Sequence, residues 1–73
     1  MQMFVSRRRA VQELVTRRRL LTEELEQAKP PDCAALENGI SDLERLILDV
    51  RAGRLNVFEL VDKGGAVTRV FVS

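Results

Sequence analysis

Hydrophobic residues recur every three or four positions along two stretches of the chain, and this spacing predicts two long amphipathic helices. In residues 6–29 the repeat is carried by Val11, Leu14, Leu21, Leu25 and Ala28. In residues 32–52 it is carried by Cys33, Leu36, Ile40, Leu43, Ile47 and Val50. Pro30 and Pro31 end the first helix, because proline cannot continue the helical hydrogen-bond ladder. A connection this short makes the helices antiparallel neighbours, an αα-hairpin.

Capping residues mark the ends of both predicted helices. Ser6 is expected to cap the start of the first helix, since its hydroxyl can accept from a free backbone N–H. Asp32 is expected to do the same for the second helix. Gly53 is the expected left-handed residue after the last turn.

The C-terminal tail changes to residues that favour strands. Asn56–Val61 and Ala66–Val72 flank a turn built on Gly64 and Gly65, which together predict a β-hairpin. The letters NVFE also have the form of a capping box, so Asn56–Val61 has a second interpretation as one helical turn. Its valines and phenylalanine favour the strand.

The N-terminal segment QMFVS resembles the C-terminal RVFVS and is a candidate third strand. An isolated hairpin is only marginally stable in water, so helices or a further strand must cover it. The sequence therefore predicts an α+β fold in which the αα-hairpin packs on a small antiparallel sheet. At 73 residues, positions 1–73 form a single domain.

Composition narrows the chemistry available to this chain. It has one cysteine, Cys33, and no histidine, so neither an intrachain disulfide nor a Cys/His metal site is expected. General acid–base catalysis usually uses histidine, which favours a protein that is not an enzyme and needs no cofactor. No apolar run approaches the length of a membrane span, and we expect a cytoplasmic protein without membrane contact.

Charge is distributed unevenly within the first predicted helix. Residues 7–19 contain six arginines and one acid, Glu13, whereas residues 20–28 contain three acids and no base. A helix N-terminus carries partial positive charge and its C-terminus partial negative charge, so both halves oppose the helix dipole. We therefore expect contacts outside this helix to stabilise its charge distribution.

Arg7 and Arg18 lie on the same line as the apolar repeat, which allows two interpretations. In one, they lie at the edge of the hairpin or pair with acids of the second helix, namely Asp42, Glu44 or Asp49. In the other, the basic half of the helix faces a partner, with apolar anchors from the preceding strand. The partner-binding residues predicted on that basis are Phe4, Val5, Ser6, Arg7, Arg8, Arg9, Arg17, Arg18 and Arg19.

Three functions fit this pattern. A protein-binding regulator would use arginines on an acidic partner surface, and a free strand edge could join the partner's sheet. A nucleic-acid-binding protein would use them on phosphates, but the net charge is only +1 and no aromatic residue lies among them. A homodimer could pair the basic half of one first helix with the acidic half of another.

The chain length and the arginine-rich opening MFVSRRRAVQELV resemble small phage-encoded transcription regulators of the short antiterminator type. This resemblance implies a phage protein in the host cytoplasm that binds the host RNA polymerase through its β′ subunit. It further implies inhibition of initiation, by disturbing the hold of the σ factor, and suppression of termination.

Overall fold

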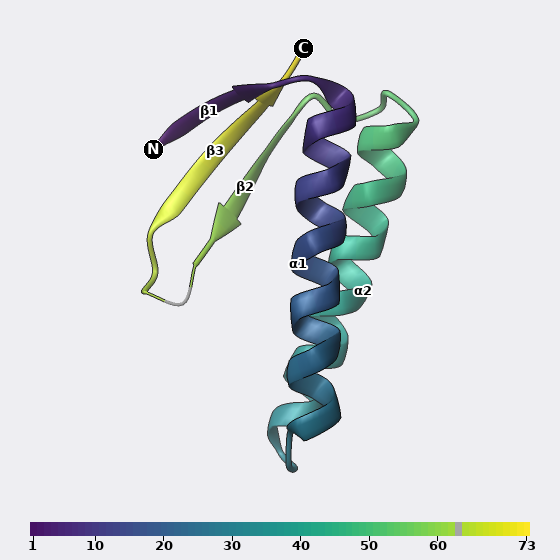
Figure 1. Ribbon diagram of the computed structural model, residues 1–73, viewed down its shortest axis with the longest axis vertical. Coiled ribbons are helices and arrows are strands. Elements are labelled where there is room, and N and C mark those ends of the chain that lie inside the picture. The colour runs from purple at the N-terminus through teal and green to yellow at the C-terminus, as the bar shows by residue number, and fades with distance from the viewer. Residues whose placement is uncertain (63) are drawn as a thin grey trace.

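The computed structural model describes residues 1–62 and 64–73, and it confirms an α+β fold. The elements in chain order are β1 (Gln2–Val5), α1 (Arg7–Gln27), α2 (Asp32–Arg51), β2 (Val57–Val61) and β3 (Val67–Val72). The two helices lie side by side as the predicted hairpin, and the sheet lies along their upper part only (Figure 1). Lys63, which belongs to the predicted turn of the β-hairpin, lies outside the described residues.

The sheet has three strands in the order β1-β3-β2 and is mixed rather than wholly antiparallel. β2 and β3 form the predicted antiparallel hairpin, so the alternative of a helical turn at Asn56–Val61 is wrong. The N-terminal strand exists, but it pairs parallel to β3, with Phe4 opposite Phe71. The antiparallel hairpin brings the end of α2 back beside the end of β1. β2 therefore starts there and runs antiparallel to β1, and β3 then runs parallel to β1.

The predicted helix caps are confirmed at two of three places. The Ser6 hydroxyl accepts from the backbone N–H of Arg9 at 3.2 Å, and Gly53 has a φ of +80°. Asp32 is not the N-cap of α2, because Pro31 holds that position and makes no side-chain cap bond. As the first helical residue, Asp32 still places its negative charge at the favourable end of the helix dipole.

The hydrophobic core lies where the hairpin and the sheet overlap. It contains Ala10 and Leu14 from α1, Leu43, Ile47 and Val50 from α2, and Phe58, Leu60 and Val70 from the sheet. The first three positions of the α2 repeat, Cys33, Leu36 and Ile40, are only half-buried. None of them is among the residues that form this core or pack against it, and the end of α2 that begins after the prolines extends beyond the strands (Figure 1).

Gly39 lies in the interior of α2, where it faces a side chain of α1 at close distance. A Cβ atom added there would come within 3.3 Å of Leu21 Cδ1, the end of a flexible and half-buried side chain. Alanine in a helix interior is more favourable than glycine by about 1 kcal/mol. We therefore expect Gly39→Ala to raise the free energy of unfolding by about 0.5 kcal/mol in urea titrations, since Leu21 must shift slightly. A lower value than wild type would mean that Leu21 cannot move.

Candidate functional site

The antiparallel hairpin brings the start of α1 beside the end of α2, and Arg7 joins the two. Its Nη1 donates to the carbonyl oxygen of Val50 at 2.6 Å, and its Nη2 donates to Asn56 Oδ1 at 2.8 Å. Val50 belongs to the last turn of α2, where carbonyl groups lack the regular helical partner four residues on, and its oxygen also accepts from the backbone N–H of Gly53 at 3.1 Å. Arg7, which lies in the first turn of α1, therefore caps the C-terminal end of α2.

This contact explains why an arginine lies at the disfavoured end of α1. The C-terminus of α2 carries partial negative charge, so a cation that opposes the dipole of its own helix is favourable to the neighbouring one. The predicted acidic partners of Arg7 do not serve it. Asp49, one of those acids, instead pairs with Arg54 at 3.1 Å.

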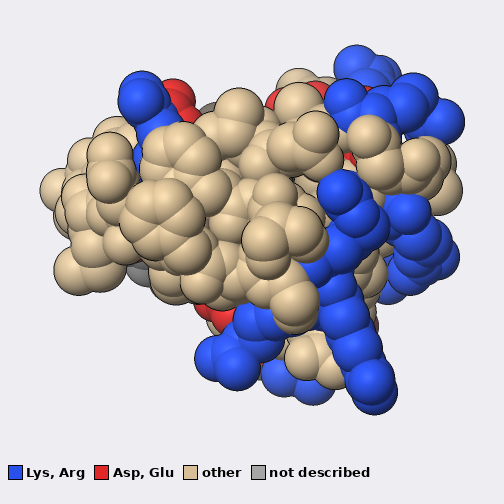
Figure 2. Space-filling view, turned by 90° about the horizontal axis from the view of Figure 1, so that it is seen from above, with Lys and Arg blue, Asp and Glu red and all other residues tan. Residues whose placement is uncertain are grey.

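The same end of the molecule gathers further arginines, and we call this cluster the basic end. Its members are Arg7, Arg8, Arg9, Arg51 and Arg54. Viewed from this end, basic side chains crowd one side beside a broad surface of uncharged residues (Figure 2). The sequence interpretation missed Arg51 and Arg54, although the antiparallel hairpin that it predicted would have placed them next to the first triplet.

Phe4 is exposed on the face of the sheet that points away from the helices. It is 73% exposed, and its ring stacks on Phe71 with centroids 4.9 Å apart and planes inclined by 15°. Phe71 is in register with Val57, so these three residues form a line across the sheet that we call the apolar row. Val5 points to the opposite face and packs against the core, so it does not share the surface of Phe4.

The second arginine triplet is divided among different environments. Arg19 is exposed, whereas Arg18 is half-buried. Arg17 lines a groove between the hairpin and β2, and its Nε is buried with no hydrogen-bond partner among the described residues. The nine predicted partner-binding residues thus do not form one surface: Phe4, Ser6, Arg8, Arg9 and Arg19 are exposed. Ser6 and Arg7 make internal hydrogen bonds, while Arg17 turns to the groove.

Within the described ranges, 1–62 and 64–73, no group of three or more His, Cys, Asp or Glu residues is placed to hold a metal ion. The single thiol, Cys33, lies 3.6 Å from the carbonyl oxygen of Ala28 as a weak donor. In the same part of the chain, neither helix is apolar enough over a sufficient length to cross a membrane.

Comparison with known proteins adds no relative. No family model matches the chain, and neither a curated protein nor a solved structure shows significant similarity to it. The surface chemistry of the chain itself is therefore what bears on its function.

Proposed function

We propose that this protein is a non-enzymatic regulator that acts by binding another protein through the basic end and the apolar row. The observation that carries the proposal is the exposed Phe4–Phe71 stack, which lies at the same end of the sheet as the arginine cluster. A partner that covers Phe4 would remove a large aromatic side chain from water. Aromatic residues and arginine are the residue types most enriched among side chains that dominate binding energy.

The arginines at this end complement an acidic partner surface. The side chains of Arg8 and Arg9 have no ion pair or hydrogen bond to the described residues, and both are exposed. Arginine can form two parallel hydrogen bonds with one carboxylate, which gives geometric specificity as well as energy. The resemblance in the opening segment makes the host RNA polymerase, through its β′ subunit, the proposed partner. Inhibition of initiation and antitermination in the host cytoplasm are the proposed consequences.

Nucleic-acid binding is the second candidate, and one observation favours it. The fold places Phe4, at the end of β1, near the arginine cluster at the start of α1, whereas in the sequence no aromatic residue stands among the arginines. However, one ring face of Phe4 already stacks on Phe71, and the ion pair Arg69–Glu59 at 3.0 Å places an acid on the same sheet face. Both features reduce the surface available to stacked bases and phosphates. A homodimer that joins basic and acidic ends remains a further prediction.

The test is capture of purified bacterial RNA polymerase by the immobilised protein, with and without nuclease. The variant Arg8→Glu/Arg9→Glu should bind about a hundred-fold more weakly, because reversed charges would face an acidic surface. Lys29→Glu/Arg45→Glu is the matched control, since it makes the same change in net charge at exposed positions outside the basic end and outside the predicted partner-binding residues. Equal losses in both variants, or capture that disappears with nuclease, would contradict the proposal.

A further inference from the structure

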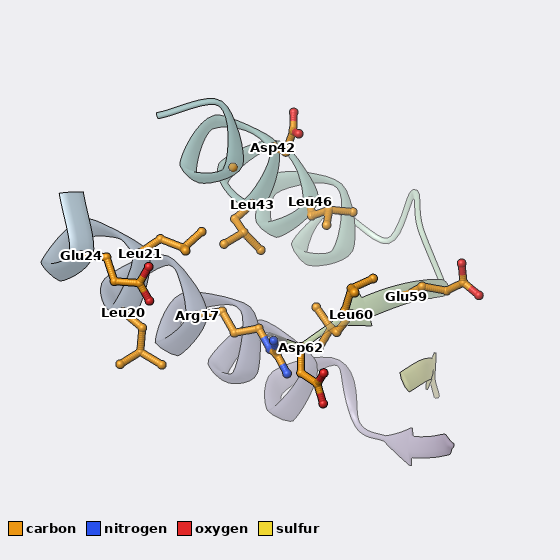
Figure 3. Close-up of a pocket in the computed structure, with 12 residues that line it drawn as sticks. Arg17, Leu20, Leu21, Glu24, Asp42, Leu43, Leu46, Glu59, Leu60 and Asp62 are labelled. Atoms are coloured by element: carbon orange, nitrogen blue, oxygen red, sulfur yellow. The ribbon is translucent and has the colours of Figure 1, made fainter. Parts of the chain in front are cut away.

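A groove of about 530 Å³ separates the free side of β2 from the two helices. Its walls are mainly apolar, and the residues that line it include Leu21 from α1, Leu43 and Leu46 from α2, and Leu60 and Val61 from β2. Leu21 and Leu43 point toward each other from α1 and α2, and Leu60 enters from β2 (Figure 3). Arg17 reaches toward Asp62, whereas Glu59 points away (Figure 3). The groove therefore has an apolar floor with charges at its margin.

β2 forms one edge of the sheet, and its hydrogen-bonding pattern identifies which backbone groups lie on the open side. Val72 donates to the carbonyl oxygen of Asn56 at 2.8 Å, and Asp62 donates to that of Ala66 at 3.0 Å. In an antiparallel pair, successive residues alternate between facing the partner strand and facing away. The N–H and C=O groups of Val57, Glu59 and Val61 consequently point off the edge. A strand that paired with them would lie alongside the groove.

We propose that this edge and groove together receive one extended segment of a partner protein as a fourth strand of the sheet. Unpaired backbone groups on an edge strand are a ready template for another strand, and such docking gives affinity through main-chain hydrogen bonds. The apolar groove beside the edge would provide the side-chain specificity. The fourth strand would also cover Leu46 and Leu21, which are only half-buried because the sheet stops at β2.

The side chains of β2 specify the sequence pattern of this segment. Residues directly opposite each other on neighbouring strands point to the same face of a sheet. The residue opposite Glu59 therefore lies on the outer face. Glu59 Oε2 already accepts from Arg69 at 3.0 Å, so a lysine or arginine there would complement the other carboxylate oxygen. Residues opposite Phe58 and Leu60 lie on the helix side of the sheet, and the one opposite Leu60 faces the groove that Leu60 lines, where an apolar side chain fits. The occupant is an apolar–basic–apolar segment in extended conformation.

A second copy of this chain does not fit the site. Paired β2 strands in full antiparallel register would place Glu59 directly against Glu59 of the other copy, and like charges in that position are destabilising. The residues of the second β2 that face the helix side are Phe58 and Leu60. Each is only 6% exposed because it is already buried in its own core, so it cannot fill the groove of a neighbour.

The groove is separate from the arginines proposed for polymerase binding, although Val57 of the apolar row also belongs to the β2 edge. Arg8 and Arg9 are not among the residues that line the groove. Loss of binding at one surface is therefore distinguishable from loss at the other. The variant Arg8→Glu/Arg9→Glu should bind a strand-forming peptide as wild type does.

The experiment titrates the full chain with the synthetic peptide acetyl-SGTVKLTGS-amide and follows backbone amide signals by NMR. We expect shifts at Val57, Glu59 and Val61, and binding about fivefold weaker for the control peptide acetyl-SGTVELTGS-amide. Glu59→Lys should reverse that preference, so that the glutamate peptide binds more tightly. Shifts absent from β2, or an unchanged preference in Glu59→Lys, would overturn the proposal.

A second variant tests the backbone contribution. Val61→Pro removes an outward N–H, which an edge strand tolerates because the internal ladder uses the neighbouring residues. It should weaken binding of the lysine peptide about fivefold, the loss typical of one backbone hydrogen bond, while Val61→Thr should not. Equal binding by both variants, with native helix content in each, would overturn strand addition. Concentration-dependent self-association through the β2 edge would also overturn it in favour of a second copy.

Discussion

Replacing Arg7 with alanine is expected to lower the free energy of unfolding by about 2 kcal/mol, the scale of hydrogen bonds from a charged donor. The half-buried guanidinium donates at 2.6 Å to the carbonyl oxygen of Val50 and at 2.8 Å to Asn56 Oδ1. Alanine would leave the Val50 carbonyl without this donor and would remove a cation from the C-terminal end of α2. It would also release the link between α2 and the start of β2.

Urea titration of the purified chain measures this effect, and two variants control it. Arg8→Ala should stay within about 0.5 kcal/mol of wild type, because surface substitutions outside special contacts have small effects. Arg7→Lys should recover only part of the loss, since lysine presents a point charge rather than a planar fork of donors. If Arg7→Ala were as stable as wild type but lost polymerase capture, Arg7 would instead serve the partner surface.

Leu14→Ala is expected to destabilise the chain by about 3 kcal/mol, within the range measured for buried leucines. Leu14 is fully buried in α1 at the centre of the cluster that joins both helices to the sheet. The substitution removes apolar contacts and leaves a cavity that the surrounding helices can only partly close. A core of this size seldom supplies more than about 3–5 kcal/mol in total, so the variant should be largely unfolded at 37 °C.

Circular dichroism on heating follows this loss through the helical signal. Leu48→Ala is the matched control, because Leu48 is 58% exposed on α2 and alanine is also a good helix former. It should melt within a few degrees of wild type, while Leu14→Ala should melt far below it. Similar melting of the two variants would show that the core does not depend on Leu14.

The helical hairpin could be predicted from the sequence because its signal is local. The apolar repeat and the proline pair determine where each helix runs, and a short connection leaves only an antiparallel arrangement. The pairing of the N-terminal strand could not be predicted in this way, because its partner β3 is distant in the sequence. Alternation along Gln2–Val5 indicates a strand but says nothing about which strand it joins or in which direction. The parallel pairing with β3 follows from the path of the whole chain.

The arginines of the candidate site also differ in what the sequence and the tertiary structure reveal about them. The sequence marks Arg7, Arg8 and Arg9 alike, as three cations in the first turn of a helix. The tertiary structure distinguishes them, because Val50 at the end of α2 and Asn56 after it accept from the side chain of Arg7 and not from those of Arg8 and Arg9. Likewise, Phe4 and Val5 look equivalent as apolar anchors until the pleat of β1 sends them to opposite faces.

By itself the sequence determined the α+β class, the two helices, the β-hairpin and the uneven charge of the first helix. These depend on neighbours a few positions apart, whose spacing and residue types act locally. The tertiary structure decided the mixed sheet, the capping of α2 by Arg7, the exposed Phe4–Phe71 stack and the groove beside β2. Each of these joins residues distant in the chain, and their contacts depend on how complete helices and strands pack in three dimensions.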